Sequence, residues 1–363
     1  MNALMKIIGI ACMTCMLAGP AQAEPRELIS VWYSLLSNPM HVHGHAPWLR
    51  AMEQATDNKI KITEYAVGTI CPDAESMEAC SSGIVDMACQ LIGRNPGKFP
   101  RLEITCLPMM FNSSPACTYA FWELIEKHPS LQKELKDYKL LSWMGGVPTQ
   151  LLLRDKPVRK FEDLKGLKLG INQANIAPSV SALGAVPVFV AYSDMYLAME
   201  RGMVDGLILP ETAMVALKVD ELTKYMTVIN LIVSGDITVM SKGTWDSLDE
   251  DVRQKLTPFI GPVGGLKRCQ YHFPLQEEGW QSIKSRGAEI ITLPPEEYAK
   301  LEEAVKPVHE AWLKEMEDKG FKDIRAIHAD LMELAKKYSD VNAVKAKMLE
   351  DLKAVGLDTP TWQ

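Results

Sequence analysis

The sequence has few of the features that mark catalysis or nucleic-acid binding. It contains no G-x-S-x-G elbow, Walker loop, H-E-x-x-H pair or dinucleotide glycine fingerprint. Lysine and arginine number 39 against 46 aspartates and glutamates, a formal charge of −7, and the two signs are mixed along the chain. Because no basic patch is present, a nucleic-acid partner is disfavoured. No cofactor is predicted. We therefore do not expect an enzyme.

Long apolar runs are also scarce. The one run of note, residues 7–17, follows Lys6 and precedes the small-residue sequence Ala21-Gln22-Ala23. A charged start, a short apolar core and a small-residue site together predict a secretion signal over residues 1–23. The run is too short to span a membrane, which needs about 20 residues. The mature chain is predicted to begin near Glu24 and to be periplasmic.

Cysteines are few enough for each to be considered. Two of the eight leave with the predicted signal, and the rest are Cys71, Cys80, Cys89, Cys106, Cys117 and Cys269. Export to an oxidising space makes disulfides possible, although the sequence does not choose among the pairings. Cys106 with Cys117 is our first expectation, since both flank one turn-rich loop. No redox motif remains in the mature chain.

What the chain does contain is a regular alternation of strands and helices, which predicts an α/β fold. Strands are expected at residues 28–33 and 59–65, with a helix at 45–55 between them. A unit of helix, Gly-x-Val-Asp and buried strand occurs twice, around Gly83 and Gly202. Each glycine stands where a helix should stop, a position that favours a left-handed backbone. Two lobes built on one plan explain this repetition.

The remaining elements are predicted to connect the lobes. The segment 226–240 is rich in Val, Ile and Thr and is interpreted as strands that cross between lobes. Residues 294–316 form an amphipathic pattern at helical spacing, long enough to brace both lobes, with Pro307 expected to kink it. Further helices are expected at 324–338 and 341–355.

Two lobes imply a cleft, and residues just past the carboxyl ends of strands should line it. Aromatic side chains there would form walls, and polar side chains would orient a ligand, although ordinary packing is the alternative for each aromatic residue. Together with the family resemblance described below, this rule gives the predicted ligand-binding set: Trp32, Tyr33, Gln90, Arg94, Phe111, Trp143, Gln150, Gly170, Asn172, Tyr192, Leu209 and Glu211.

The sequence His41-Val-His43-Gly-His45 is the only metal-like signal. Imidazoles suit zinc or copper, and alternate residues share one face of an extended segment. However, three histidines without a further ligand make an incomplete site, and a helix is predicted to begin here. We favour a helix-entry loop near the cleft over a metal site.

Several motifs resemble the solute-binding proteins of tripartite ATP-independent periplasmic (TRAP) transporters, the DctP-like, C4-dicarboxylate-type receptors. They are FEDLKGLKLG at 161–170, SALGAVPV at 181–188, YLAMERGMVDG at 196–206, GIVDM at 83–87 and LPMMF at 107–111. The resemblance covers nearly the whole mature chain. It implies a periplasmic binding-protein fold of two α/β lobes, two crossing strands and a long helix spanning both lobes.

The resemblance also implies a division of the chain and a mode of action. Lobe I is expected at 24–147 and 236–276, and lobe II at 148–235 and 277–363 with the spanning and C-terminal helices. The protein is expected to act as a monomer, to capture a small solute by lobe closure, and to deliver it to the membrane permease subunits of a TRAP-type transporter.

The chain departs from the family at the ligand. The strand after DLKGLK usually carries an arginine that grips a carboxylate, and here that position is Gly170. The asparagine before the proline of the family's ENP motif corresponds to Leu209, and a second arginine of the family falls around Thr149 or Gln150. We therefore expect a neutral or cationic solute, with Glu211 as a counter-charge in the cationic case. The alternative is an organic acid bound through Arg94 or Arg154.

Three rival functions remain open at this point. An exported two-lobed hydrolase would need a nucleophile or metal set that the sequence does not single out. A sensor that presents its solute to a membrane kinase would share the same fold. A zinc-binding receptor would use the loop from His41 to His45.

Overall fold

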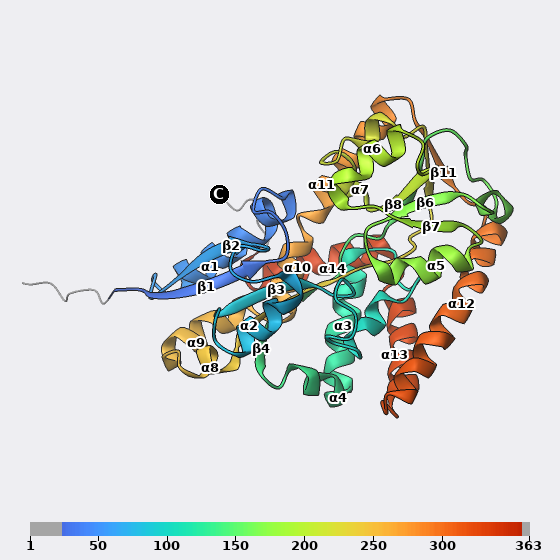
Figure 1. Cartoon of the computed structure of the whole chain (residues 1–363). Helices are drawn as coiled ribbons and strands as arrows, with labels where there is room; N and C mark the ends of the chain where they lie inside the picture. Colours follow the sequence, from blue (N-terminus) through green and yellow to red (C-terminus); the bar gives the residue numbers. More distant parts are fainter. Residues whose placement is uncertain (1–23, 358–363) are drawn as a thin grey trace, which may run out of the picture.

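The computed structural model describes residues 24–357 of the chain. The predicted secretion signal at 1–23 lies outside the described residues. Within them, the elements alternate along the chain and gather around two separate sheets (Figure 1). The prediction of a two-lobed α/β fold is confirmed.

The first lobe is built on a five-stranded sheet in the order β2-β1-β3-β10-β4. Its strands are β1 (Arg26–Trp32), β2 (Ile60–Ala66), β3 (Met87–Leu91), β4 (Tyr138–Met144) and β10 (Asp236–Ser241). β1 pairs in parallel with β2 and β3, whereas β10 runs antiparallel between β3 and β4. The chain therefore returns to complete this sheet after building most of the second lobe.

Helices and buried apolar side chains cover both faces of the first sheet. The α-helices are α1 (Ala46–Ala55), α2 (Ser76–Ser81), α3 (Ser114–Lys127), α4 (Pro129–Gln132), α8 (Lys242–Asp246), α9 (Glu250–Leu256) and α10 (Pro262–Cys269). A π-helical turn, η1 (His41–His45), leads into α1, and short 3-10 turns are η2 (Asp73–Glu75), η3 (Leu102–Cys106), η4 (Lys133–Leu135) and η9 (Thr257–Phe259).

The second lobe is built on a six-stranded sheet in the order β11-β9-β5-β8-β6-β7. Its strands are β5 (Gln150–Leu153), β6 (Lys168–Ile171), β7 (Val186–Phe189), β8 (Gly206–Leu209), β9 (Tyr225–Val228) and β11 (Glu289–Thr292). Its helical segments are η5 (Phe161–Leu164), η6 (Ala174–Ile176), α5 (Ala177–Ala182), η7 (Tyr192–Asp194), α6 (Met195–Glu200), α7 (Glu211–Met214), η8 (Val219–Glu221) and α11 (His272–Ser285).

Two antiparallel segments connect the sheets and confirm the predicted crossing. One leads from β4 to β5 and the other from β9 to β10. They are bonded to each other where the backbone N–H of Thr149 donates to Ile232 O at 2.9 Å and that of Leu231 donates to Thr149 O at 3.0 Å. A Cβ at Gly146 would lie 2.3 Å from Ser234 O, so this close approach requires glycine.

A long helix, α12 (Pro295–Asp318), spans both lobes and contains Pro307. Its first half contributes Leu301 and Val305 to the core of the second lobe. Its second half contributes Leu313 and Met316 to the core of the first lobe. Figure 1 shows it in orange along one side of the molecule. The predicted spanning helix is confirmed.

The C-terminal helices α13 (Ile324–Lys337) and α14 (Val341–Ala354) differ from the predicted division of the chain. The sequence-based boundaries placed 277–363 with the second lobe. Leu331 of α13 and Met348 of α14 instead join the first-lobe core. Both helices contact α3, which is part of the first lobe. One face of α3 lies on the first sheet. The apolar stripes of α13 and α14 cover its opposite face.

Two glycine turns confirm the repeated unit. Gly83 has φ of 79° and Gly202 has φ of 71°, each between a helix and a buried strand. An aspartate three residues after each glycine bonds to the backbone of another strand. Asp86 Oδ2 accepts from Ile29 N at 2.8 Å, and Asp205 Oδ2 accepts from Lys168 N at 2.8 Å. The Asp of the motif therefore ties each strand to a neighbouring strand.

The six cysteines of the described chain are free thiols, and all except Cys71 are buried. The expected disulfide between Cys106 and Cys117 is absent. The Cys106 thiol lies 3.6 Å from Ile92 O, to which it donates, and Cys117 packs against Gly145. Each sulfur is thus accommodated separately in the first lobe. Among the helices of residues 24–357, none combines the length and apolar character needed to cross a membrane.

Candidate functional site

The ends of β1 and β3 bring together a small polar group on the first lobe. Arg94 Nη1 donates to Tyr33 O at 2.7 Å, and the guanidinium carbon lies 5.3 Å from the Tyr33 ring centroid. Asp73 Oδ2 lies 3.9 Å from Nη1, so the cation has a carboxylate partner. About a third of the Arg94 side chain stays exposed. The predicted residues Tyr33 and Arg94 are therefore adjacent, with charges that are already balanced.

Tyr192 lies on the second lobe, just past β7, and 41% of it is exposed. Desolvation raises the pKa of its hydroxyl, and the Arg94 cation opposes that rise. The Arg94 cation of the first lobe therefore affects the pKa of the Tyr192 hydroxyl in the second lobe. The same edge also carries Phe189, which is largely exposed. This is the part of the predicted site where the two lobes face each other.

At position 170 the second lobe offers no charged group. A Cβ on Gly170 would lie 2.6 Å from Leu207 Cδ2 and 3.5 Å from Val190 Cγ2, so the space is already filled by apolar side chains. Leu209, at the end of β8, is buried in the same apolar cluster. The two positions at which the resembled family has an arginine and an asparagine are therefore apolar here. Asn172, just beyond β6, is half-buried.

Gln150 begins β5 beside the crossing segment. Its Oε1 accepts from Ile229 N at 2.9 Å and from Asn230 N at 3.1 Å, and its Nε2 donates to Asn230 Oδ1 at 2.8 Å. These bonds fix the side-chain amide against the backbone that joins the lobes. Gln150 thus links the start of β5 to the segment that leads from β9 to the first lobe.

Glu211 is a carboxyl buried at the start of α7, with 1% of its surface exposed. Burial raises its pKa to about 7, and the side-chain amides of Gln150 and Gln276 oppose that rise. Its Oε2 has no hydrogen-bond partner among the described residues. Backbone packing explains its position, because Gly279 of α11 lies against Glu211 so closely that a Cβ there would meet its O at 2.6 Å. Among the described residues, no lysine or arginine is one of the groups that shift its pKa.

Four predicted site residues lie in the first-lobe core. Trp143 is fully buried and stacks on Phe121, with ring centroids 4.0 Å apart and planes at 10°. Phe111 and Trp32 are also buried. Gln90 Nε2 donates to Asp73 O at 3.0 Å. Each of these side chains packs within the first lobe, and its contact with a solute stays a prediction, because the strand-end rule identifies positions but not the face on which a side chain lies.

Two of the three histidines of η1 approach one carboxylate, and the third lies elsewhere. His41 Nε2 lies 3.0 Å and His45 Nε2 3.5 Å from Glu64 Oε1, whereas His43 stacks on Tyr271 with centroids 6.0 Å apart. Burial lowers the pKa of His45 well below its usual value, which favours the neutral imidazole. Across residues 24–357, no group of three or more His, Cys, Asp or Glu side chains is arranged to hold a metal ion.

The sequence prediction missed a direct contact between the lobes. Gly93, beyond β3, has φ of 83°, and a Cβ there would lie 2.6 Å from Asn175 Nδ2 in the second lobe. Asn175 Nδ2 and Oδ1 are buried without a hydrogen-bond partner in the described chain. Neither residue carries a local signal for this contact, because it depends on how the two lobes sit together.

The described chain has two lobes on separate sheets, with polar and aromatic side chains where the lobes face each other. The sequence model of the family described as "Bacterial extracellular solute-binding protein, family 7" matches residues 36–327. The chain belongs to that family, whose members bind solutes and are not enzymes, and it is a TRAP-type solute-binding protein.

Individual relatives agree with this assignment. The C4-dicarboxylate-binding periplasmic protein DctP of Rhodobacter capsulatus is 27% identical over 331 residues, covering 89% of this chain and 96% of that protein. A TRAP solute-binding protein of Rhodoferax ferrireducens, solved with copurified benzoate, has a TM-score of 0.77 at 23% identity, over 87% of this chain and 99% of that one. An open complex from Desulfovibrio salexigens has a TM-score of 0.77 at 25% identity, over 86% of this chain and 96% of that one.

Proposed function

We propose that this receptor captures a small polar solute that is neutral or cationic rather than a simple carboxylate. The observation that carries the proposal is the charge balance at the strand ends. Gly170 and Leu209 leave that wall of the second lobe apolar, while Glu211 is a buried acid without a cationic partner. A cation brought by the solute would relieve the cost of burying that acid.

Closure of the two lobes supplies the capture step. Tyr33 and Arg94 on one lobe and Tyr192 on the other would contact the solute together, so the solute would stabilise the closed arrangement. Cation–π attraction to the exposed tyrosine face would add to the attraction of Glu211. The crossing segments and Gln150 would act as the hinge between the lobes.

The wider setting is part of the same proposal. The chain is exported to the periplasm, its signal is removed near Ala23, and the mature protein acts as a monomer. It delivers the solute to the membrane subunits of a TRAP permease. The family assignment supports this arrangement, since TRAP solute-binding proteins work with membrane permease components.

An organic acid is the second candidate, and Arg94 is the observation that favours it. The hydrogen bond to Tyr33 O uses only Nη1, and the exposed third of the side chain leaves donors toward the cleft. A charge-assisted hydrogen bond contributes about 1.5–3 kcal/mol, or roughly tenfold to hundredfold in affinity. Relatives described as binding benzoate or C4-dicarboxylates show that acids suit this fold.

A calorimetric titration with matched solutes separates the two candidates. Each set contains an acid, its primary amide and the corresponding amine on one carbon skeleton. The proposal predicts that the amide or amine binds more tightly than the acid, and that Glu211→Gln weakens the amine at least about tenfold, the loss of one charge-assisted contact. Arg94→Ala should leave this preference in place. Tight binding of the acid that Arg94→Ala abolishes would establish the second candidate instead.

A further inference from the structure

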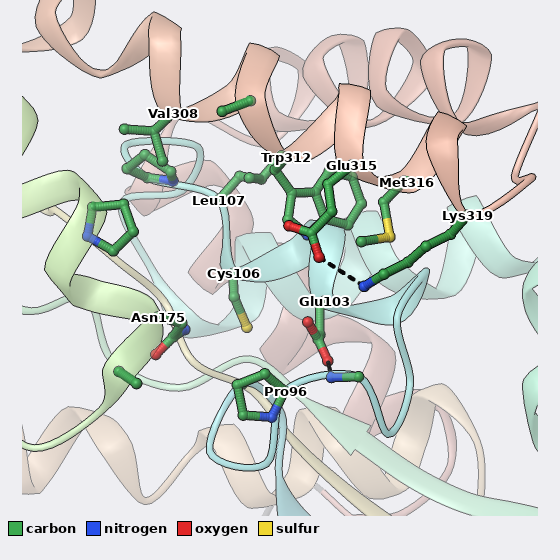
Figure 2. Close-up of a pocket in the computed structure, with 16 residues that line it drawn as sticks. Pro96, Glu103, Cys106, Leu107, Asn175, Val308, Trp312, Glu315, Met316 and Lys319 are labelled. Carbon is green, nitrogen blue, oxygen red and sulfur yellow. Dashed lines mark hydrogen bonds and ion pairs between the residues drawn. The ribbon is translucent and has the colours of Figure 1, made fainter.

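A cavity of about 550 Å³ borders the contact between Gly93 and Asn175, where the two lobes meet. Its walls come from three parts of the chain: the segment after β3, η6 with the start of α5, and α12 (Figure 2). Neither Tyr33, Arg94, Tyr192 nor Glu211 lines it. Its volume lies in the range of small-molecule sites, about 300–1,000 Å³. It is therefore a candidate for a ligand of its own.

The walls of the cavity are mainly apolar. They are formed by Leu107, Pro108, Pro178, Val308, Trp312 and Met316. Figure 2 shows Trp312 projecting from α12 between the other labelled side chains. Its indole face gives the cavity a large flat contact surface. An apolar or aromatic body is the shape and chemistry that such walls accept.

Charged groups gather at one end of the cavity. Glu103 Oε1 accepts from Gly97 N at 2.6 Å, which leaves its second oxygen available. Glu315 of α12 is paired with Lys319, whose Nζ donates to Oε1 at 2.7 Å. Figure 2 shows both interactions. Two carboxyls therefore accompany one ammonium, and that ammonium is already engaged.

Glu103 is the carboxyl whose negative charge this arrangement leaves unbalanced. Burial raises its pKa to about 7, and the neighbouring carboxyls Glu134 and Glu315 add to the rise. The Gly97 N–H bond and the Lys319 cation oppose it. A second positive charge near Glu103 would favour its ionised form, whereas an anion would meet two acids.

We propose that this cavity is a second binding site, separate from the solute cleft, for a small organic cation with an apolar body, of the arylalkylammonium class. The ammonium group contacts Glu103 and the face of Trp312, where cation–π attraction adds to the ion pair. The apolar body fills the space along α12. Asn175, which also lines the cavity, belongs to the second lobe, and Glu103 to the first. Occupancy therefore stabilises one arrangement of the lobes and is coupled to solute affinity in the cleft.

Benzyltrimethylammonium is a suitable probe, with 3-phenylpropanoate as the anion of similar size. Titration calorimetry compares the full mature protein with Glu103→Gln, which keeps an acceptor for Gly97 N–H, and with Ala311→Trp, which fills the cavity from an exposed position of α12. Glu211→Gln is the matched buried carboxyl in the other site. The probe should bind at least about tenfold more tightly than the anion, and both cavity variants should weaken it by about that factor, the loss of one charged contact.

The same series contains the results that would overturn the proposal. If Glu211→Gln weakens the probe and both cavity variants bind it as the parent does, the probe occupies the solute cleft. If the anion binds as tightly as the cation, the charge argument is wrong. Equal weak binding by all four proteins shows that the cavity takes no such ligand. Ala311→Trp keeps the test decisive even if Glu103→Gln folds poorly.

Discussion

Replacing Glu211 with glutamine should change how the stability of the protein depends on pH. Below about pH 4.5 the carboxyl is protonated in both the folded and unfolded chains. As pH rises toward about 7, the unfolded chain ionises while the folded chain keeps its proton, so the free energy of unfolding falls. The pKa rise from 4.5 to about 7 corresponds to about 3 kcal/mol, which is the size of the expected effect. Above about pH 7 the loss is complete.

Glutamine has no proton to release, so the variant escapes this loss. Urea unfolding followed by tryptophan fluorescence at about pH 4.5 and about pH 8 should show the variant gaining about 3 kcal/mol relative to the parent at the higher pH. Glu200→Gln is the control, because Glu200 is an exposed acid at the end of α6. Parallel pH profiles for the parent and Glu211→Gln would refute the reasoning, since the carboxyl would then be ionised without cost in the folded chain.

Three further predictions follow from individual contacts in the two lobes. Gly93→Ala should weaken solute binding and lower stability more than Gly83→Ala, measured by calorimetry and thermal unfolding; both have positive φ, but only at position 93 would the new Cβ meet the other lobe, and equal effects would rule that out. Asp236→Asn should cost about 3–5 kcal/mol in denaturant unfolding, because it leaves the Arg268 guanidinium buried without its carboxylate at 2.7 Å; a loss below about 1 kcal/mol would contradict this. A cationic solute should bind more tightly as pH rises from about 6 to about 8, as Glu211 ionises, with proton release detected in buffers of different ionisation enthalpy; pH-independent binding would count against that role.

The elements of the fold were largely predictable because local chemistry determines them. The left-handed glycines at 83 and 202 ended their helices as expected, and the Val- and Ile-rich segment crossed between the sheets. The apolar spacing over 294–316 predicted the spanning helix. The placement of 324–357 on the first lobe was not predictable, because an amphipathic stripe shows that a helix packs but not which surface receives it.

The candidate site was harder to predict than the fold. Tyr33, Arg94 and Tyr192 each follow a strand, as the strand-end rule expects, and their contact with a solute stays a prediction. The same rule selected Trp143, whose burial against Phe121 depends on long-range packing. The contact between Gly93 and Asn175, and the unpaired state of Glu211, arise from segments that are distant in sequence. Such features depend on the assembled lobes and leave no periodic pattern in the chain.

The first lobe takes its core from both ends of the chain. Leu124 of α3 packs in a cluster with Ile237 of β10 and Leu352 of α14, so residues near the start, the middle and the end of the chain share one apolar interior. During synthesis β4 and α10 can pack on α3 early, but the contact between α3 and α14 must wait until residues 341–354 have been made. Contacts so distant in sequence are slow to form. The order of synthesis thus leaves the first-lobe core incomplete until α14 has been made.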